Sequence, residues 1–241
     1  MNFPRSSRSA ITYLTFSLLL SNAAFGQTDF RNLNFEAARV ADLPPDSIGE
    51  VVTRSQALPG WLAMVGQNAD PPINHNFMLH GTAGISLFGP QSPVTAPEGR
   101  YFVVLQAGHE PMAPPGVLAD ASISQFGTVP SFAQSLQFLS APILGEDVMV
   151  SFGGQSLPLV LLSIDSGYGV WGADITPFAG QSGELRFTAL GTPSLPFGTF
   201  YLDDIRFSPL PVPEPSAWGL LALGAALILI TRKCLARKPC R

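Results

Sequence analysis

The chain has 241 residues and a formal net charge of −4 at pH 7, which leaves room for one domain with a real core between two terminal signals. Basic residues crowd the two ends, whereas residues 27–209 hold six arginines, no lysine and 16 acidic residues, a net charge of about −10. Such an acidic middle region argues against a nucleic-acid partner and is compatible with calcium or neutral glycans.

The N-terminal segment has the three parts of a secretory signal peptide. Two arginines precede a short apolar stretch, Ala10–Leu20, and small residues follow it. With Ala24 and Gly26 at the −3 and −1 positions, cleavage removes residues 1–26 and leaves Gln27 as the mature N-terminus. The alternative is an uncleaved anchor, for which an apolar stretch of about 11 residues is short.

The exported region, residues 27–209, predicts an all-β fold. Proline and glycine interrupt it throughout, and no stretch keeps helical periodicity for three turns. Short β-rich runs recur instead, and turn signals separate them, which indicates an antiparallel β-sandwich or jelly roll. One helical turn is expected within Asp174–Gly180, where Pro177 suits the first helical position. The predicted strands are Gly84–Phe88, Tyr101–Gln106, Ala121–Phe126, Ser135–Leu139, Val148–Phe152, Leu157–Ile164, Glu184–Leu190 and Thr199–Ser208.

The residue inventory of this region does not suggest an enzyme. It has no nucleophile-elbow, zinc-protease or phosphate-loop motif, and both cysteines, Cys234 and Cys240, lie in the C-terminal tail. His75 and His80 are five residues apart, which puts them on opposite faces of an unbroken strand and favours exposed loop histidines over a zinc pair. We therefore predict no catalytic residues, and a hydrolase is the least supported class.

The last thirty residues combine three features. Val212-Pro213-Glu214-Pro215 comes first, an uncharged apolar run from Ser216 to Thr231 follows, and five basic residues lie within 232–241. As a helix the run would span roughly 24 Å, a little less than the roughly 30 Å hydrocarbon core, so it predicts a minimal transmembrane helix. The basic tail would then face the cytoplasm. A buried core helix is the alternative, which the proline-rich linker and the basic cluster disfavour.

This arrangement resembles the PEP-CTERM sorting domain of bacterial exported proteins, over about 30 of the 241 residues. The resemblance implies that exosortase, a membrane-embedded transpeptidase-like protease, recognises the tail and cleaves near the motif. Val212, Pro213, Glu214 and Pro215 would then be a substrate site that the protease acts on. The resulting boundaries are a linker and motif at 210–215, a membrane helix at 216–231 and a basic tail at 232–241.

Fragments of the exported region resemble galactose-binding-like jelly rolls, a fold shared by many carbohydrate-binding modules. Asn34-Phe35-Glu36 is similar to their opening strand, and Tyr201–Ile205 is similar to their final strand. The resemblance implies a structural calcium between the first and last strands, with Glu36 and Asp204 as carboxylate ligands. The alternative is that Glu36 and Asp203 are solvated and Asp204 caps a turn.

Two functions from different classes follow. The leading hypothesis is an exported, membrane-anchored envelope or extracellular-matrix protein, with the domain outside the cell and a non-catalytic structural or adhesive role. Processing would then release it to the cell surface or the matrix. The alternative is a carbohydrate-binding module that engages exopolysaccharide through exposed aromatic side chains.

Overall fold

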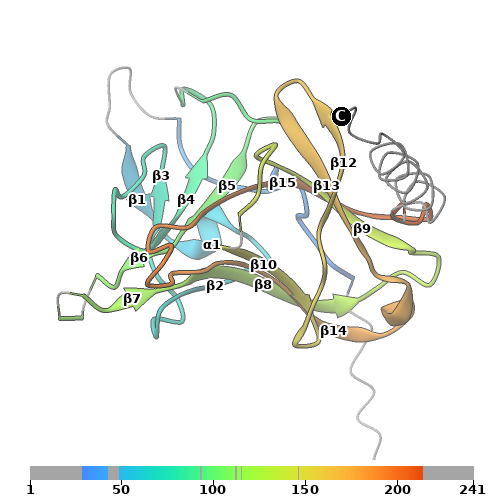
Figure 1. Cartoon of the computed structure of the whole chain (residues 1–241). Coiled ribbons are helices and arrows are strands. Elements are labelled where there is room, and N and C mark those ends of the chain that lie inside the picture. The colour runs from blue at the N-terminus through green and yellow to red at the C-terminus, as the bar shows by residue number, and fades with distance from the viewer. Residues whose placement is uncertain are drawn as a thin grey trace, which may run out of the picture.

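The computed structural model describes residues 29–42, 49–92, 94–111, 113–114, 116–145 and 147–213. These residues form two large β-sheets whose faces pack against each other, which confirms the predicted all-β class (Figure 1). The predicted signal peptide, 1–26, and the chain beyond Pro213 lie outside the described residues. Within the ranges given above, no helix has the length and apolar character needed to cross a membrane.

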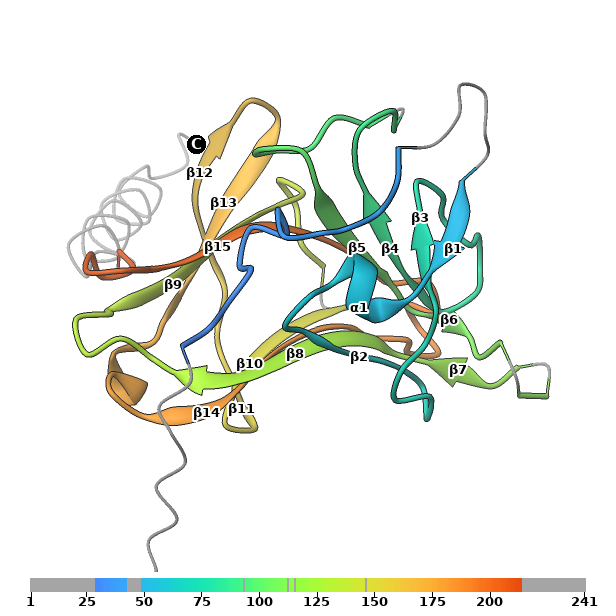
Figure 2. The same cartoon turned by 180° about the vertical axis from the view of Figure 1, so that it is seen from behind.

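The larger sheet has eight strands, and the last strand of the chain lies inside it between β5 and β9 (Figure 2). Neighbouring strands are antiparallel except β3 and β4, which run parallel. The two edges of the sheet are β1 and β12. In order across the sheet the strands are β1 (Glu50–Val52), β3 (Ile73–His75), β4 (Gly84–Phe88), β5 (Phe102–Gln106), β15 (Thr199–Ser208), β9 (Ser135–Ser140), β13 (Tyr168–Asp174) and β12 (Val160–Asp165).

The smaller sheet has five strands, all antiparallel to their neighbours. In order they are β11 (Gln155–Ser156), β10 (Val148–Phe152), β14 (Ser182–Ala189), β8 (Ala121–Thr128) and β2 (Leu62–Val65). A separate two-stranded ribbon pairs β6 (Gly108–His109) with β7 (Leu118–Ala119), and the short helical elements are α1 (Arg54–Ala57) and the 3₁₀ turn η1 (Thr176–Phe178).

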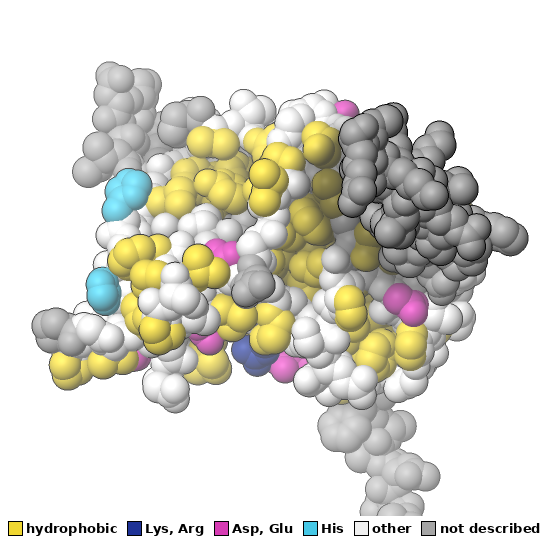
Figure 3. Space-filling model, viewed as in Figure 1, with side chains coloured by type: hydrophobic (Ala, Val, Ile, Leu, Met, Phe, Trp, Pro, Cys, Tyr) yellow, Lys and Arg dark blue, Asp and Glu magenta, His cyan; other side chains and the backbone are white. Residues whose placement is uncertain are grey.

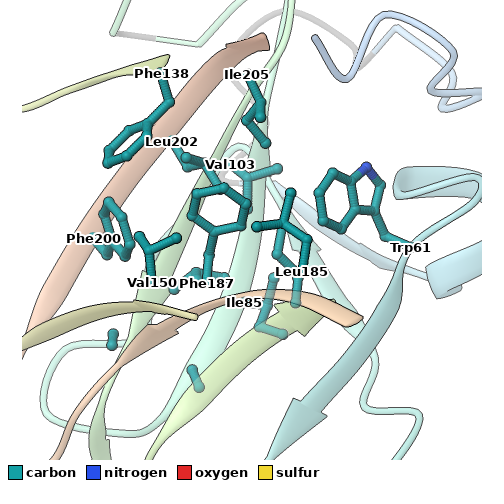
Figure 4. Packing of buried hydrophobic residues seen from close by; sticks show 14 of the residues in the cluster. Trp61, Ile85, Val103, Phe138, Val150, Leu185, Phe187, Phe200, Leu202 and Ile205 are labelled. Carbon is teal, nitrogen blue, oxygen red and sulfur yellow. The ribbon is translucent and has the colours of Figure 1, made fainter. Parts of the chain in front are cut away.

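The core lies between the two sheets because every second side chain of each strand points inward. Leu185 and Phe187 of β14 face Phe200 and Leu202 of β15, and all four are buried (Figure 4). The ring of Phe187 also contacts Trp61, which is fully buried beside the start of β2. Apolar burial of this extent is the main term that stabilises a domain without a disulfide.

Each of the eight predicted strands is present, with ends shifted by at most a few residues. The shortest strands have no sequence signal, and β13 was missed because it carries two glycines. Both glycines lie close to neighbouring side chains: a Cβ at Gly169 would lie 2.7 Å from Trp171 Nε1 and 2.9 Å from Leu161 Cδ1, and one at Gly172 would lie 2.8 Å from Leu162 Cδ1. The leucines of β12 therefore rest on bare backbone of β13.

The structure corrects two local expectations from the sequence and confirms a third. Asn34–Glu36 is not an opening strand, because Leu33–Ala37 forms a turn in which Phe35 takes a φ of 59° and inserts into the core. The expectation of exposed loop histidines is wrong for His75, which is buried in β3. The helical turn after Asp174 is confirmed as η1, with Pro177 at its start.

Candidate functional site

The carboxylate of Glu36 holds the loop that leads into β5. Its Oε1 atom accepts hydrogen bonds from the backbone N–H groups of Arg100, at 2.6 Å, and Tyr101, at 2.9 Å. Gly99, directly before Arg100, has a φ of 59°, and a Cβ there would overlap the Glu36 carboxylate, so the loop needs glycine at this position. Glu36 thus ties the N-terminal turn to the larger sheet.

Asp203 in β15 holds the same loop from beneath. Its Oδ2 atom accepts a hydrogen bond from Glu98 N at 3.0 Å, and its Oδ1 atom accepts one from Asp204 N at 2.8 Å. The side chain is fully buried, and no cation of the described residues forms an ion pair with it. Burial raises the pKa of Asp203 to about 7, and the neighbouring carboxylates of Asp204 and Glu36 add to this rise, while the two N–H donors oppose it.

Tyr168 on β13 shares the covered surroundings of Asp203. Burial raises the pKa of the Tyr168 hydroxyl above its ordinary value, with smaller contributions from Tyr201 and Asp203. This hydroxyl donates a hydrogen bond to Thr95 O at 3.0 Å. Asp203 therefore lies under a covered part of the outer face of the larger sheet, where water does not screen its charge.

The predicted calcium ligands have other partners in this arrangement. Asp204 has a φ of 42° at a bulge in β15, and its Oδ2 atom lies 2.9 Å from Arg206 Nη1. Glu36 is bound by the loop amides described above. Over the described ranges, no three His, Cys, Asp or Glu side chains are grouped so as to hold a metal ion. Calcium at Glu36 and Asp204 stays a prediction.

A polar hollow of about 310 Å³ lies on the outer face of the smaller sheet. Ser122 and Ser124 of β8 form part of its lining and are almost completely buried, and Arg186 of β14 lies beside them. The guanidinium of Arg186 donates to Ser122 Oγ at 3.0 Å and to Glu184 Oε1 at 2.7 Å. Thr188, opposite Ser122 in the pairing, has a buried hydroxyl without a hydrogen-bond partner among the described residues.

The rim of this hollow combines a second arginine with exposed apolar side chains. Arg54 of α1 forms an ion pair with Asp70 at 2.6 Å and donates to Trp61 O. Leu62 and Met64 of β2 complete the lining, and Leu62 is 60% exposed. A hollow with paired charges, hydroxyl groups and an apolar rim is suited to an uncharged, hydroxyl-rich ligand. Sequence reasoning missed it because it arises from strands paired over long separations.

The segment that follows β15 stays in contact with the body as far as the structure describes it. Ser135 Oγ donates to Leu210 O at 2.7 Å, and Gln134 N donates to Ser208 O at 2.8 Å, which hold this end of the chain against β9. Pro211, Val212 and Pro213 then run past Val160 of β12.

Comparison with known families gives one match for this end of the chain. A protein-family model described as the PEP-CTERM protein-sorting motif matches residues 211–233. This chain carries a PEP-CTERM protein-sorting motif. No curated protein matches the chain at a significant level.

The match confirms the predicted sorting signal. The PEP-CTERM motif begins at the residue after Leu210, the last residue for which the structure shows a hydrogen bond to the body. Of the predicted motif residues, Val212 and Pro213 are described and lie beside β12, whereas Glu214 and Pro215 lie outside the described residues. The chain is therefore a protein sorted by exosortase to the cell envelope and associated with the membrane through its C-terminus.

Proposed function

We propose that this protein is a secreted β-sheet module anchored in the membrane by its C-terminal segment 216–231, which forms a single helix. Its body would lie outside the cell after removal of residues 1–26. The body has a structural or adhesive role in the envelope and carries out no catalysis. Processing near Val212–Pro215 by exosortase then transfers it to the surface or the extracellular matrix.

The main support for this proposal is the position of the sorting motif. It starts at residue 211, directly after Leu210, which is the last of the described residues with a hydrogen bond to the body. A protease that acts near the motif would release the folded body without removing any strand from it. The acidic, cysteine-free composition of residues 27–209 suits a region that folds outside the cytoplasm.

A chain that ends at Leu210 is expected to be released into the medium as a folded protein. The truncation removes the apolar run and the basic tail but keeps the hydrogen bond from Ser135 to Leu210. Fractionation of the native cells, followed by circular dichroism of the released protein, measures both properties. The fold of this variant should match that of the mature protein.

A matched variant separates anchoring from processing. Replacing Pro213, Glu214 and Pro215 by alanine leaves the apolar run intact, so this chain should stay in the membrane fraction with its C-terminus uncleaved. Intact mass of the mature and variant proteins gives both ends of each chain. Recovery of the full-length wild-type chain from the cytosol, with both termini intact, would refute the proposal.

A second candidate function is binding of a neutral polysaccharide in the polar hollow on the smaller sheet. The specific observation is the pairing of Arg186 with Glu184, next to the buried hydroxyl groups of Ser122 and Ser124. Paired guanidinium and carboxylate groups at a site rimmed by Leu62 and Met64 are suited to sugar hydroxyls and to the apolar face of a pyranose ring.

Replacing Arg186 by alanine is expected to weaken polysaccharide binding at least about tenfold, because a charged hydrogen bond contributes roughly 1.5–3 kcal/mol. The measurement is affinity electrophoresis of the mature protein in gels that contain exopolysaccharide of the native cell. The control is Arg206→Ala, which removes an arginine paired with Asp204 at a separate place. If the wild-type protein binds no polymer, the structural role is favoured.

A further inference from the structure

The edge strand β12 carries exposed apolar side chains. Val160 is 36% exposed, Leu161 38% and Ile164 62%. Only β13 pairs with this strand, so its other edge has no strand neighbour among the described residues. Natural proteins usually protect such an edge with charges, prolines or a covering segment, but β12 has one charged residue, Asp165, at its end.

The end of the folded body lies beside this strand. Pro211, Val212 and Pro213 line an open groove of about 380 Å³ together with Pro158 and Val160. Leu210, at the start of this segment, is 67% exposed. We call Val160, Leu161, Ile164 and Leu210 the exit patch. Val160 pairs with Gly172, whereas Leu161 and Ile164 pair with Trp171 and Gly169, so the patch includes both faces of this edge strand. Figure 3 shows hydrophobic side chains at several places on the face of the molecule that carries the β12–β13 hairpin.

The distance from the exit patch to the apolar run is short. Two residues, Glu214 and Pro215, separate Pro213 from Ser216, and a fully extended chain covers at most about 10 Å over these three Cα-to-Cα steps. The apolar run must therefore begin within about 10 Å of the point where the linker leaves Val160. If the run enters the bilayer there, the exit patch lies at the depth of the lipid headgroups.

We propose that the exit patch rests on the outer surface of the lipid bilayer and orients the body with β12 towards the membrane. This inference depends on the proposed membrane anchor. The contact buries apolar side chains in the headgroup region, and the lack of basic residues on β12 makes it independent of anionic lipid. Because β1 and β12 are opposite edges of an eight-stranded sheet, β1 points away from the membrane, roughly 30 Å from β12.

Single cysteine reporters test this orientation in the full mature chain. Residues 27–209 contain no cysteine, so Cys234→Ser and Cys240→Ser give a background without thiols. Ile164→Cys and, separately, Leu210→Cys place an environment-sensitive nitrobenzoxadiazole dye in the exit patch. The matched control is Val51→Cys on β1, where the native side chain is 59% exposed. Each protein is reconstituted into phosphatidylcholine vesicles with or without headgroup-level nitroxide lipid.

The expected result is several-fold stronger quenching by nitroxide lipid at positions 164 and 210 than at position 51, unchanged by salt. Equal, weak quenching at all three positions in protein that floats with the vesicles would overturn the inference and leave the anchor intact. Protein that does not float at all would refute the anchor itself. A blue shift at 164 without nitroxide quenching would indicate a second copy of the chain on β12, which also overturns the inference.

Discussion

Replacing Phe187 by alanine is expected to lower the free energy of unfolding by about 3–5 kcal/mol. Phe187 is fully buried, and its ring lies 5.6 Å from Phe138, 6.1 Å from Phe200 and 6.2 Å from Trp61. It joins the smaller sheet, through β14, to two strands of the larger one (Figure 4). Truncation would leave a cavity that the paired strands on both sides prevent from collapsing.

The measurement is urea denaturation of the detergent-solubilised mature protein, followed by tryptophan fluorescence, to which the buried Trp61 contributes. Domains are typically stable by only about 5–15 kcal/mol, so the variant is expected to unfold at a much lower urea concentration. Phe132→Ala is the control, because Phe132 is 58% exposed and its truncation should change the free energy by about 0.5 kcal/mol or less. Equal effects of the two substitutions would contradict the described core.

Stability is expected to fall as the pH rises from about 4 to about 7, because of Asp203. Its pKa is about 7 in the folded protein against an ordinary value of 3.8, so the folded state binds more protons than the unfolded state between these values. Proton linkage then lowers the free energy of unfolding as the pH rises through this range. Each pKa unit corresponds to 1.36 kcal/mol, which puts the total contribution at up to about 4 kcal/mol.

Asp203→Asn is expected to flatten this pH dependence. The amide stays neutral at every pH, so the variant should be less stable than the wild type near pH 4, where the protonated acid keeps its hydrogen bonds, and as stable or more stable near pH 8. Thermal denaturation from pH 4 to pH 8 checks both ends of the profile. Asp165→Asn, at an exposed position, should leave the profile unchanged. A variant profile parallel to that of the wild type would show that Asp203 is not the titrating group.

The same titration tests the predicted calcium. A cation bound near Glu36 and Asp204 would favour the ionised form of Asp203, so calcium should raise the melting temperature most above pH 7. A melting temperature that chelator leaves unchanged at every pH would remove calcium from this site. In that case the hydrogen bonds of Glu36 and Asp203 to residues 98–101 are sufficient to hold the loop.

The exit patch and the sorting motif together imply that the body has one position before cleavage and another after it. While anchored, the body would lie on the membrane with β12 towards the lipid, close to where exosortase acts. After cleavage near Val212–Pro215, a patch of four apolar side chains is too small to hold the body on lipid by itself. The contact would therefore orient the substrate during processing without retaining the product.

The acidic doublet in β15 shows where sequence reasoning about the site fails. Asp203 and Asp204 are adjacent, and local pattern cannot tell which of them is buried, because a bulge with a φ of 42° at Asp204 decides it. The resemblance to jelly-roll final strands points to Asp204, which pairs with Arg206, whereas Asp203 is the carboxylate beneath the loop at residue 98. That contact joins residues 105 positions apart, so no short window of sequence contains it.

The sequence by itself determined the sorting motif, the acid surplus of the body and eight of the longer strands, because each depends on residues that are neighbours along the chain. Only the tertiary structure decided the order of the strands, the burial of Asp203, the polar hollow over β8 and β14, and the position of β12 beside the start of the sorting motif. These features need contacts between distant segments, and many pairings satisfy the same alternation of polar and apolar residues. The choice among them is made by how the side chains of both sheets fill a common core.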